Sequence, residues 1–418
     1  MIKEFFSFKF IGSLLISLFL LFEINASIVL VASLLYFLIF VFYNYKNKKD
    51  FNFTCLELLI YTLPFSFSAL VSQVNFISLF VVCQILMTIC GFLNLKKINY
   101  FSSLVLVFTL VINIIYIISL VLSGSIYYEV MIKMNIFLFS LFVISNNFKL
   151  NYEAAYYLER KFVLVSLIAA LTIFLQYIFL HYFGINTLGT QSAMGEFRQG
   201  FSGLFFDYSI MSIFMAGTAG YVIFKLLNKK VIFSKVLDIV LIVVFIYVSI
   251  LTSARSGIVA LILALVFFLL WKRNFKILFF GSILGIPVLY YLLQYLSKSR
   301  GTTITNDSGR LGNLTQSLDY IYDNPIFGSG GLGYNAITSN MLPHNFVLDF
   351  LADFGIVMFI FYMIILFYIL YNGFKYSPEV SFLFILYMFG AMFHASFINT
   401  HYIMFPIIII LAIKRQYR

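Results

Sequence analysis

Long apolar stretches recur along almost the whole chain, and they constrain its fold more than any other feature. Each approaches the roughly 20 residues that a helix needs to cross a hydrocarbon core of about 30 Å. Hydrophobic residues make up 62% of the chain and charged residues only 10%, whereas a soluble domain carries roughly a quarter charged residues. The sequence therefore predicts an all-α, polytopic integral membrane protein, with a single transmembrane domain over residues 1–418.

We expect about 12–14 transmembrane helices from the lengths of these stretches. The uncertainty comes from the stretch that contains Lys133 and from the short pair at the C-terminal end. The predicted spans are residues 5–22, 26–43, 52–70, 75–93, 101–122, 129–145, 162–183, 205–226, 236–252, 256–271, 276–296, 345–371, 380–396 and 400–413.

The basic residues indicate the direction in which the helices cross. With both termini in the cytoplasm, 21 of the 27 basic residues fall on the cytoplasmic side, as the positive-inside rule requires. The net charge of +11 is explained by this topology, so the expected partner is the lipid bilayer and not nucleic acid. Five basic residues remain on the outer face, which also receives all four histidines, and we expect function there. These five are Arg198, Arg255, Lys298, Arg300 and Arg310.

Residues 297–344 form the one long extramembrane segment that the sequence predicts, a large outer loop. Asp307-Ser308 can cap a helix and Asn324-Pro325 would end it, with apolar residues between them at spacings of three and four. This pattern predicts a short amphipathic helix at the membrane surface. Arg310 falls in its first turn, where it either binds an anion together with free backbone N–H groups or stays a solvated surface arginine. The apolar residues are Leu311, Leu314, Leu318 and Ile321.

His344 and Asn345 open the apolar stretch that follows this loop, and Asp349 and Asp353 come one and two turns later. A histidine near carboxylates suits general-base catalysis, but an interfacial structural histidine fits the same pattern. The loop also carries Asp319 and a glycine run over residues 327–334, which permits either a close approach to a ligand or simple flexibility.

Two further arginines lie close to lipid. Arg255 interrupts two apolar stretches, and a cation at the bilayer centre costs roughly 2.5–3.5 kcal/mol, so it should face a polar cavity or extend to the outer headgroups. Arg198 lies in a polar loop, where it could pair with Glu196 or Asp207. With Arg310, these arginines suggest a doubly charged ligand such as a pyrophosphate, because the guanidinium binds phosphate oxygens in pairs. We predict no metal site and no cofactor.

At these residues the sequence resembles the O-antigen polymerase and O-antigen ligase superfamily of bacterial envelope glycosyltransferases. The resemblance covers roughly residues 195–372, and Asp353 departs from it where glutamate is common. The matching elements are Arg198-Gln-Gly-Phe-Ser-Gly-Leu-Phe, Thr252-Ser-Ala-Arg-Ser-Gly257, Ser308-Gly-Arg310 followed by Asn324-Pro-Ile-Phe-Gly-Ser-Gly, and His344-Asn345 leading to Asp353-Phe-Gly-Ile356.

The resemblance implies a GT-C-like fold in the bacterial inner membrane, with a periplasmic active site that takes an oligosaccharide from undecaprenyl diphosphate without a metal. Arg198 and Arg255 would contact the diphosphate, Arg310 would assist, and His344 would activate the acceptor hydroxyl. Asp319 and Asn345 complete the predicted substrate-binding set. The implied partners are the lipid-linked oligosaccharide and a chain-length regulator.

Three functions fit these features. A polymerase transfers to another lipid-linked repeat unit and a ligase transfers to lipid A core. We favour the polymerase, because polymerases are the more divergent members and are rich in Phe, Tyr and Ile. A lipid-linked oligosaccharide flippase, which is not an enzyme, should instead place charges within its helices along a central path. Lys133 and Glu57 are the candidates for such charges.

Overall fold

The structure is a computed structural model, and two compact units account for the chain. It describes residues 4, 7–68, 78–95, 98–123, 128–193, 198–205, 207–298, 310–330, 345–393 and 401–413. The first unit comprises residues 1–82, 153–306 and 382–390, and the second comprises residues 83–152, 307–381 and 391–418. Segments of the two units alternate along the sequence. The single transmembrane domain over residues 1–418 stays a prediction.

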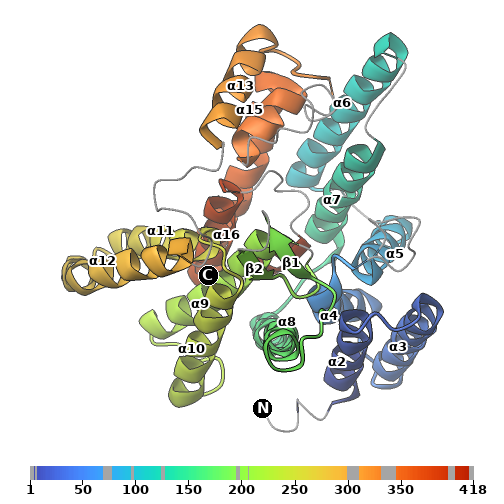
Figure 1. The fold of residues 1–418 in the computed structure, drawn as a ribbon. Helices are drawn as coiled ribbons and strands as arrows, with labels where there is room; N and C mark the ends of the chain where they lie inside the picture. The colour runs from blue at the N-terminus through green and yellow to red at the C-terminus, as the bar shows by residue number, and fades with distance from the viewer. Residues whose placement is uncertain are drawn as a thin grey trace. The chain divides into compact units, whose positions relative to one another are not determined.

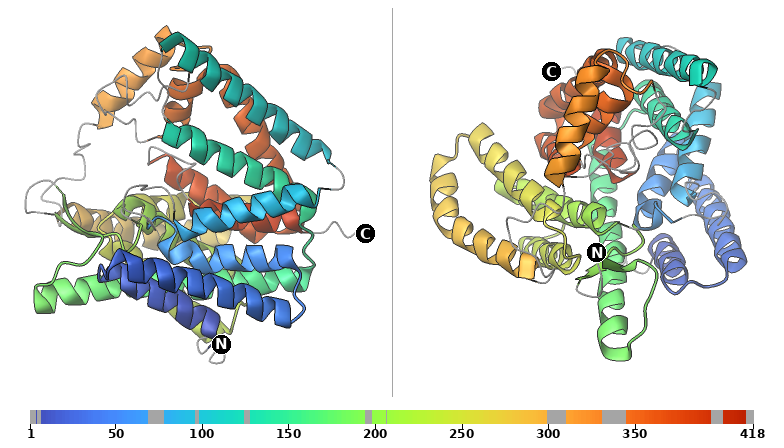
Figure 2. Two further views of the ribbon diagram at one scale, coloured as in Figure 1. Left: turned by 90° about the vertical axis from the view of Figure 1, so that its right-hand side faces the viewer. Right: turned by 45° about the horizontal axis from the view of Figure 1, so that its top comes forward.

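The first unit is a helical bundle with one β-hairpin (Figure 1). The helix α2 lies beside α3, as two views show (Figure 1 and Figure 2). The elements of the first unit are α2 (Phe8–Leu21), α3 (Ala26–Lys46), α4 (Phe51–Thr62) with the 3-10 turn η1 (Leu63–Phe65), α8 (Tyr152–Phe183), β1 (Thr190–Ala193), β2 (Arg198–Phe201), α9 (Tyr208–Leu227), α10 (Lys235–Leu251), α11 (Ser256–Trp271), α12 (Phe275–Lys298) and most of α16 (Pro378–Ala391).

The helix α9 is the centre of this unit, and it packs against α10 and α11. Small residues on α9 allow α16 to approach closely, as is common between membrane helices. A Cβ at Gly217 would lie only 2.2 Å from the Tyr387 ring. Further along α9, Phe224 packs against Phe268 and Phe382, with ring centroids 5.0 and 5.6 Å away. The site described below is therefore built on the helix with the largest buried share among the six long apolar helices.

The helix α8 begins ten residues before the predicted start at residue 162, at Tyr152. Charged residues in its first turns argue against a membrane span, but ion pairs neutralise them inside the bundle. The Lys225 ammonium lies 2.6 Å from the Glu159 carboxylate, and both side chains are buried. Arg160 and Lys161 contact Glu4 at 3.2 and 2.9 Å. Long-range ion pairs of this kind cannot be read from local hydropathy.

The second unit contains two long helices that pack against each other in opposite directions. Three aromatic contacts join α6 to α15, from Phe101–Tyr368 at 4.3 Å through Phe108–Tyr362 at 6.3 Å to Tyr116–Phe354 at 5.7 Å between ring centroids. The elements of this unit are most of α5 (Leu79–Leu93), α6 (Tyr100–Ser123), α7 (Tyr128–Asn147), α13 (Arg310–Asp323), α15 (Phe346–Tyr376), η2 (His401–Ile403) and α17 (Met404–Ala412).

The all-α polytopic membrane fold is confirmed. A described helix overlaps each of the fourteen predicted spans. Within the described ranges, six helices are long and apolar enough to cross a membrane, namely α3, α6, α7, α8, α9 and α15. Several shorter apolar helices lie over other predicted spans, and the total of about 12–14 crossings stays a prediction. The sequence did not predict the β1–β2 hairpin, because two four-residue strands are too short to show a periodic pattern.

Candidate active site

Arg255 lies in a tight turn between α10 and α11. The turn consists of residues 252–255, and Ser253 adopts a left-handed conformation with φ of +60°, which is uncommon for a residue with a side chain. Arg255 is half-buried and occupies the N-cap position of α11, where it supplies no side-chain acceptor. The first N–H groups of α11 are therefore not capped by the side chain of this residue.

Two serines fix this turn against α9. The hydroxyl groups of Ser212 and Ser249 lie 2.9 Å apart, and Ser249 Oγ donates to the Ser212 carbonyl at 3.1 Å. Ser212 Oγ also donates to the Ala254 carbonyl, directly before Arg255, at 3.4 Å. On α11, a Cβ at Gly257 would lie 2.3 Å from the Ser212 carbonyl oxygen. Only glycine permits this approach, so the glycine after Arg255 sets the position of the turn.

The strand that begins with Arg198 lies against the same turn. A Cβ at Gly200 would be 3.4 Å from the Thr252 carbonyl oxygen and 3.5 Å from the Tyr208 ring. Strand β2 pairs antiparallel with β1, with Arg198 opposite Ala193. Gln176 of α8 holds the base of the hairpin, since its Oε1 accepts from the Gly203 N–H at 2.9 Å. The strand that begins with Arg198 thus contacts the turn that contains Arg255 at Gly200, and a shared role of the two arginines stays a prediction.

Two helix N-termini meet at this place. Asp207 caps α9, and its Oδ1 accepts from the N–H groups of Ser209 and Ile210 at 2.6 and 3.0 Å. Ser256 Oγ donates to the Ser209 carbonyl at 3.5 Å, which links the first turns of α9 and α11. Each N-terminus carries about half a positive charge. The Asp207 carboxylate already occupies the first N–H groups of α9, so the N-terminus of α11, beside Arg255 in the sequence, is the one that suits an anion such as a phosphate.

The second unit holds the other predicted residues. Arg310 is the first residue of α13, Asp319 is exposed further along it, and the helix ends before Asn324-Pro325 as predicted. The predicted helix is confirmed, and its place at the membrane surface stays a prediction. Leu318 is 47% exposed, whereas Ser317 is fully buried. Since α13 packs on α15, the apolar side of α13 is at least partly left open.

Asn345 caps α15, with its Oδ1 accepting from the Val347 N–H at 3.0 Å and the Leu348 N–H at 3.4 Å. The helix then breaks at Gly355, where φ is +71° and ψ is −178°. The segment after α13 fills the break, because Ser329 N–H donates to the Ala352 carbonyl at 2.7 Å. Ser329 Oγ also lies 3.4 Å from Asp353 Oδ1. Sequence reasoning missed Ser329, although the glycine run around it indicated a close backbone approach.

Some predicted site residues cannot be placed in full. His344 lies outside the described residues, as does Glu196. For Arg198 and Arg310 the structure describes the backbone alone. Among the side chains that it does describe, no group of three or more His, Cys, Asp or Glu residues could hold a metal ion. The candidate roles of these residues stay predictions.

Residues 239–363 match a family model described as O-antigen ligase. This segment contains Arg255, Arg310, Asp319, His344 and Asn345 and begins after Arg198. No curated protein matches the chain.

Proposed function

We propose that this chain is an O-antigen polymerase, since its residues 239–363 match the O-antigen ligase family model. It extends a surface polysaccharide by transferring an oligosaccharide from undecaprenyl diphosphate to a hydroxyl of another lipid-linked repeat unit. The reaction takes place at the periplasmic face of the bacterial inner membrane, and both termini lie in the cytoplasm. The charge pattern of the sequence supports this orientation.

The observation that carries the proposal is the fixed position of Arg255. The Ser212–Ser249 hydrogen bonds and the contact at Gly257 hold its turn at the meeting point of the α9 and α11 N-termini. A polar group held this rigidly next to apolar helices is preorganised, and preorganised charge needs little rearrangement when a reaction proceeds. The same turn contacts the strand that begins with Arg198, and in this proposal Arg198 is the second arginine that contacts the diphosphate.

The chemistry requires such groups. The acceptor hydroxyl oxygen attacks the anomeric carbon, the bond between that carbon and the diphosphate oxygen breaks, and undecaprenyl diphosphate leaves with the bonding electrons. Negative charge therefore grows on the leaving oxygen, where Arg198 and Arg255 stabilise it and Arg310 assists. Removing one such donor typically costs about 10²–10³ in rate. In this proposal, guanidinium groups and the N-terminus of α11 neutralise the diphosphate in place of a metal ion.

His344 accepts or orients the proton of the attacking hydroxyl. General-base assistance of this kind contributes about 10²–10⁴-fold. Asp319 and Asn345 belong to the substrate-binding set in this proposal. Asn345 caps the first turn of α15 and directly follows His344 in the sequence.

A ligase is the second candidate, favoured by the description of the matching family model. The banding of cell-surface glycans from a deletion strain distinguishes the two functions. A polymerase deletion leaves a single repeat on lipid A core. A ligase deletion leaves long polymer on undecaprenyl diphosphate and none on lipid A core. The first pattern supports our proposal and the second refutes it in favour of the ligase.

The two intrahelical charges that a flippase could use have partners in the structure. Glu57 is fully buried and contacts Lys9 at 2.6 Å and Lys49 at 3.2 Å. It also accepts from the Asn44 amide at 2.9 Å. Lys133 pairs with Glu129 one turn away on α7. Both charges are engaged in local ion pairs, which favours a structural role over a transport path.

A further inference from the structure

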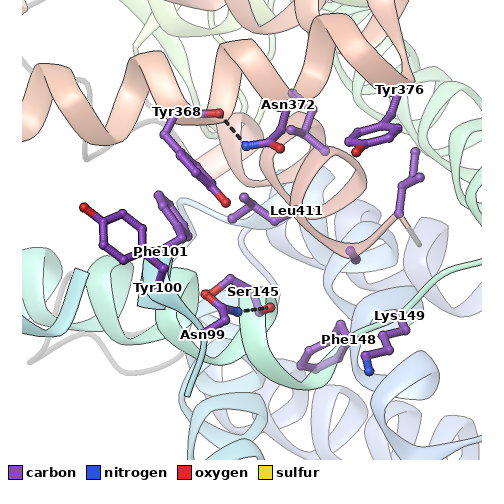
Figure 3. A pocket seen from close by; sticks show the side chains of 13 residues that line it. Asn99, Tyr100, Phe101, Ser145, Phe148, Lys149, Tyr368, Asn372, Tyr376 and Leu411 are labelled. Carbon is purple, nitrogen blue, oxygen red and sulfur yellow. Dashed lines mark hydrogen bonds between the residues drawn. The ribbon is translucent and has the colours of Figure 1, made fainter. Parts of the chain in front are cut away.

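A cavity of about 530 Å³ opens among four helix ends of the second unit (Figure 3). The start of α6 supplies Asn99 and Phe101, and the residues after α7 supply Phe148 and Lys149. The last turns of α15 and α17 complete the wall with Tyr368, Asn372 and Tyr376, and with residues 410–413. The positive-inside pattern assigns this end of the helices to the cytoplasm, whereas the proposed transferase site lies on the opposite face.

Direct contacts hold the walls of this cavity in place. Asn99 Nδ2 donates to the Ser145 carbonyl at 2.7 Å, and Asn372 Nδ2 donates to the Tyr368 carbonyl at 2.8 Å, as Figure 3 shows. The Leu150 N–H donates to the Ala412 carbonyl at 2.6 Å. The Phe101 and Tyr368 rings stack at 4.3 Å with an angle of 9°. These contacts between neighbouring helix ends fix the shape of the cavity.

The lining has two chemical characters. Asn99, Ser145, Lys149 and three tyrosines supply polar groups, and Phe101, Phe148 and the isoleucines and leucine of α17 supply an apolar wall. No carboxylate belongs to the lining residues. A ligand that combines a polar head with an apolar chain fits this lining, because the head can contact the polar residues and the chain can contact the apolar wall.

The charges favour an anionic head. Lys149 lines the cavity and is exposed. The Lys375 ammonium lies 5.6 Å from the centre of the ring of Tyr376, which is one of the lining residues. The ends of α7, α15 and α17 bring about half a negative charge each, and the start of α6 brings about half a positive charge. Among the described groups, the two ammonium groups outweigh the helix ends, and a net charge of about +1 remains.

We propose that this cavity binds the headgroup of an anionic phospholipid of the inner leaflet. The phosphate is held by Lys149 and by hydroxyl donors such as Tyr376, and the glycerol and first acyl carbons lie against Phe101 and residues 410–413. Cytoplasmic leaflets carry anionic lipids, and basic pockets between transmembrane helices at that side bind such headgroups. This site is separate from the transferase reaction and does not depend on it.

Native mass spectrometry of the full chain in detergent tests the proposal, with phosphatidylglycerol, phosphatidylcholine and inorganic phosphate titrated separately. We expect phosphatidylglycerol to be retained in preference to phosphatidylcholine. Lys149→Gln should weaken that retention about fivefold, because one lysine near a membrane surface contributes about that factor. Leu411→Trp should also weaken retention, because the larger side chain takes up space at the apolar wall where the acyl carbons would lie. The matched control is Lys235→Gln, an exposed lysine of the first unit on the same predicted face, which should change nothing.

Equal retention of both lipids would overturn the proposal in favour of an apolar pocket. Displacement of phosphatidylglycerol by an equal concentration of inorganic phosphate would identify a soluble phosphate as the ligand and would also overturn it. Unchanged retention in both Lys149→Gln and Leu411→Trp would show that the lipid binds elsewhere. Because Lys149 is exposed, its substitution leaves the fold intact, and unchanged melting temperatures of the variants will verify this.

Discussion

The amide nitrogen of Ser329 lies 2.7 Å from the carbonyl oxygen of Ala352. This hydrogen bond joins the segment after α13 to the turn of α15 that precedes the break at Gly355. A second bond, from the Ile356 N–H to the Pro325 carbonyl at 2.9 Å, closes the other side of the break. Backbone groups freed inside a membrane must find partners, and here the predicted outer loop supplies them. The segment that follows α13, at Pro325 and Ser329, is thereby fixed to α15.

Gly355→Ala should destabilise the protein. Alanine would have to adopt φ of +71°, and its Cβ would lie 2.1 Å from the Ile326 carbonyl oxygen. Backbone strain of this kind alone costs of order 1–3 kcal/mol, and the clash adds to it. The measurement is thermal unfolding in detergent. The control is Gly281→Ala, in α12, where a Cβ meets no atom within 4 Å. Equal melting temperatures for the two variants would show that the break tolerates a side chain.

Arg255→Ala should reduce polymer extension by about 10²–10³-fold, the typical cost of losing one donor to a developing anion. Arg255→Lys should fall between the wild type and Arg255→Ala, because lysine keeps the charge and loses the paired donors. Polysaccharide chain length on gels and the amount of protein in the membrane are the readouts. Arg273→Ala, an exposed arginine after the other end of α11, should behave as the wild type. Normal chain length in Arg255→Ala would refute its role.

His344→Ala should slow transfer from a purified lipid-linked donor by about 10²–10⁴-fold. Loss of a general base affects the chemical step, so single-turnover rates should fall while donor binding is kept. His181→Ala serves as the control, since His181 lies in the last turn of α8 and is exposed. If the His344 variant turns over at the wild-type rate, no base is needed at that position.

Glu57→Gln should lower the stability of the first unit by about 3–5 kcal/mol, because it leaves buried ammonium groups without a counter-charge. The Lys9 and Lys49 ammonium groups both contact the Glu57 carboxylate, whose side chain is 0% exposed. The matched change is Glu129→Gln, in a pair whose glutamate is 40% exposed; it should cost less than about 1 kcal/mol. Thermal unfolding of both variants in the same detergent measures the two losses of stability. Similar decreases in melting temperature would mean that burial does not determine how much each ion pair stabilises the protein.

Local sequence determined the helices. Apolar length indicated where each predicted span lies, and Asn324-Pro325 indicated the end of α13, because both signals act over neighbouring residues. The motif around Arg255 indicated a tight polar turn, which the structure contains. Arg255 and Asn345 could be singled out from sequence because a charge or a capping amide is conspicuous at the edge of an apolar run. The resemblance of residues 195–372 to the O-antigen polymerase and ligase superfamily rests on the same short motifs.

Tertiary structure decided what distant residues do to one another. Hydropathy could not foresee that α8 extends back to Tyr152, because Glu4 and Lys225 neutralise its charges from other helices. Nor could it foresee that Ser212 fixes the Arg255 turn, that Ser329 fills the break at Gly355, or that four helix ends enclose a cavity at Lys149. Contacts of this kind join residues far apart in the chain, and their energies depend on burial and distance that only the folded bundle defines.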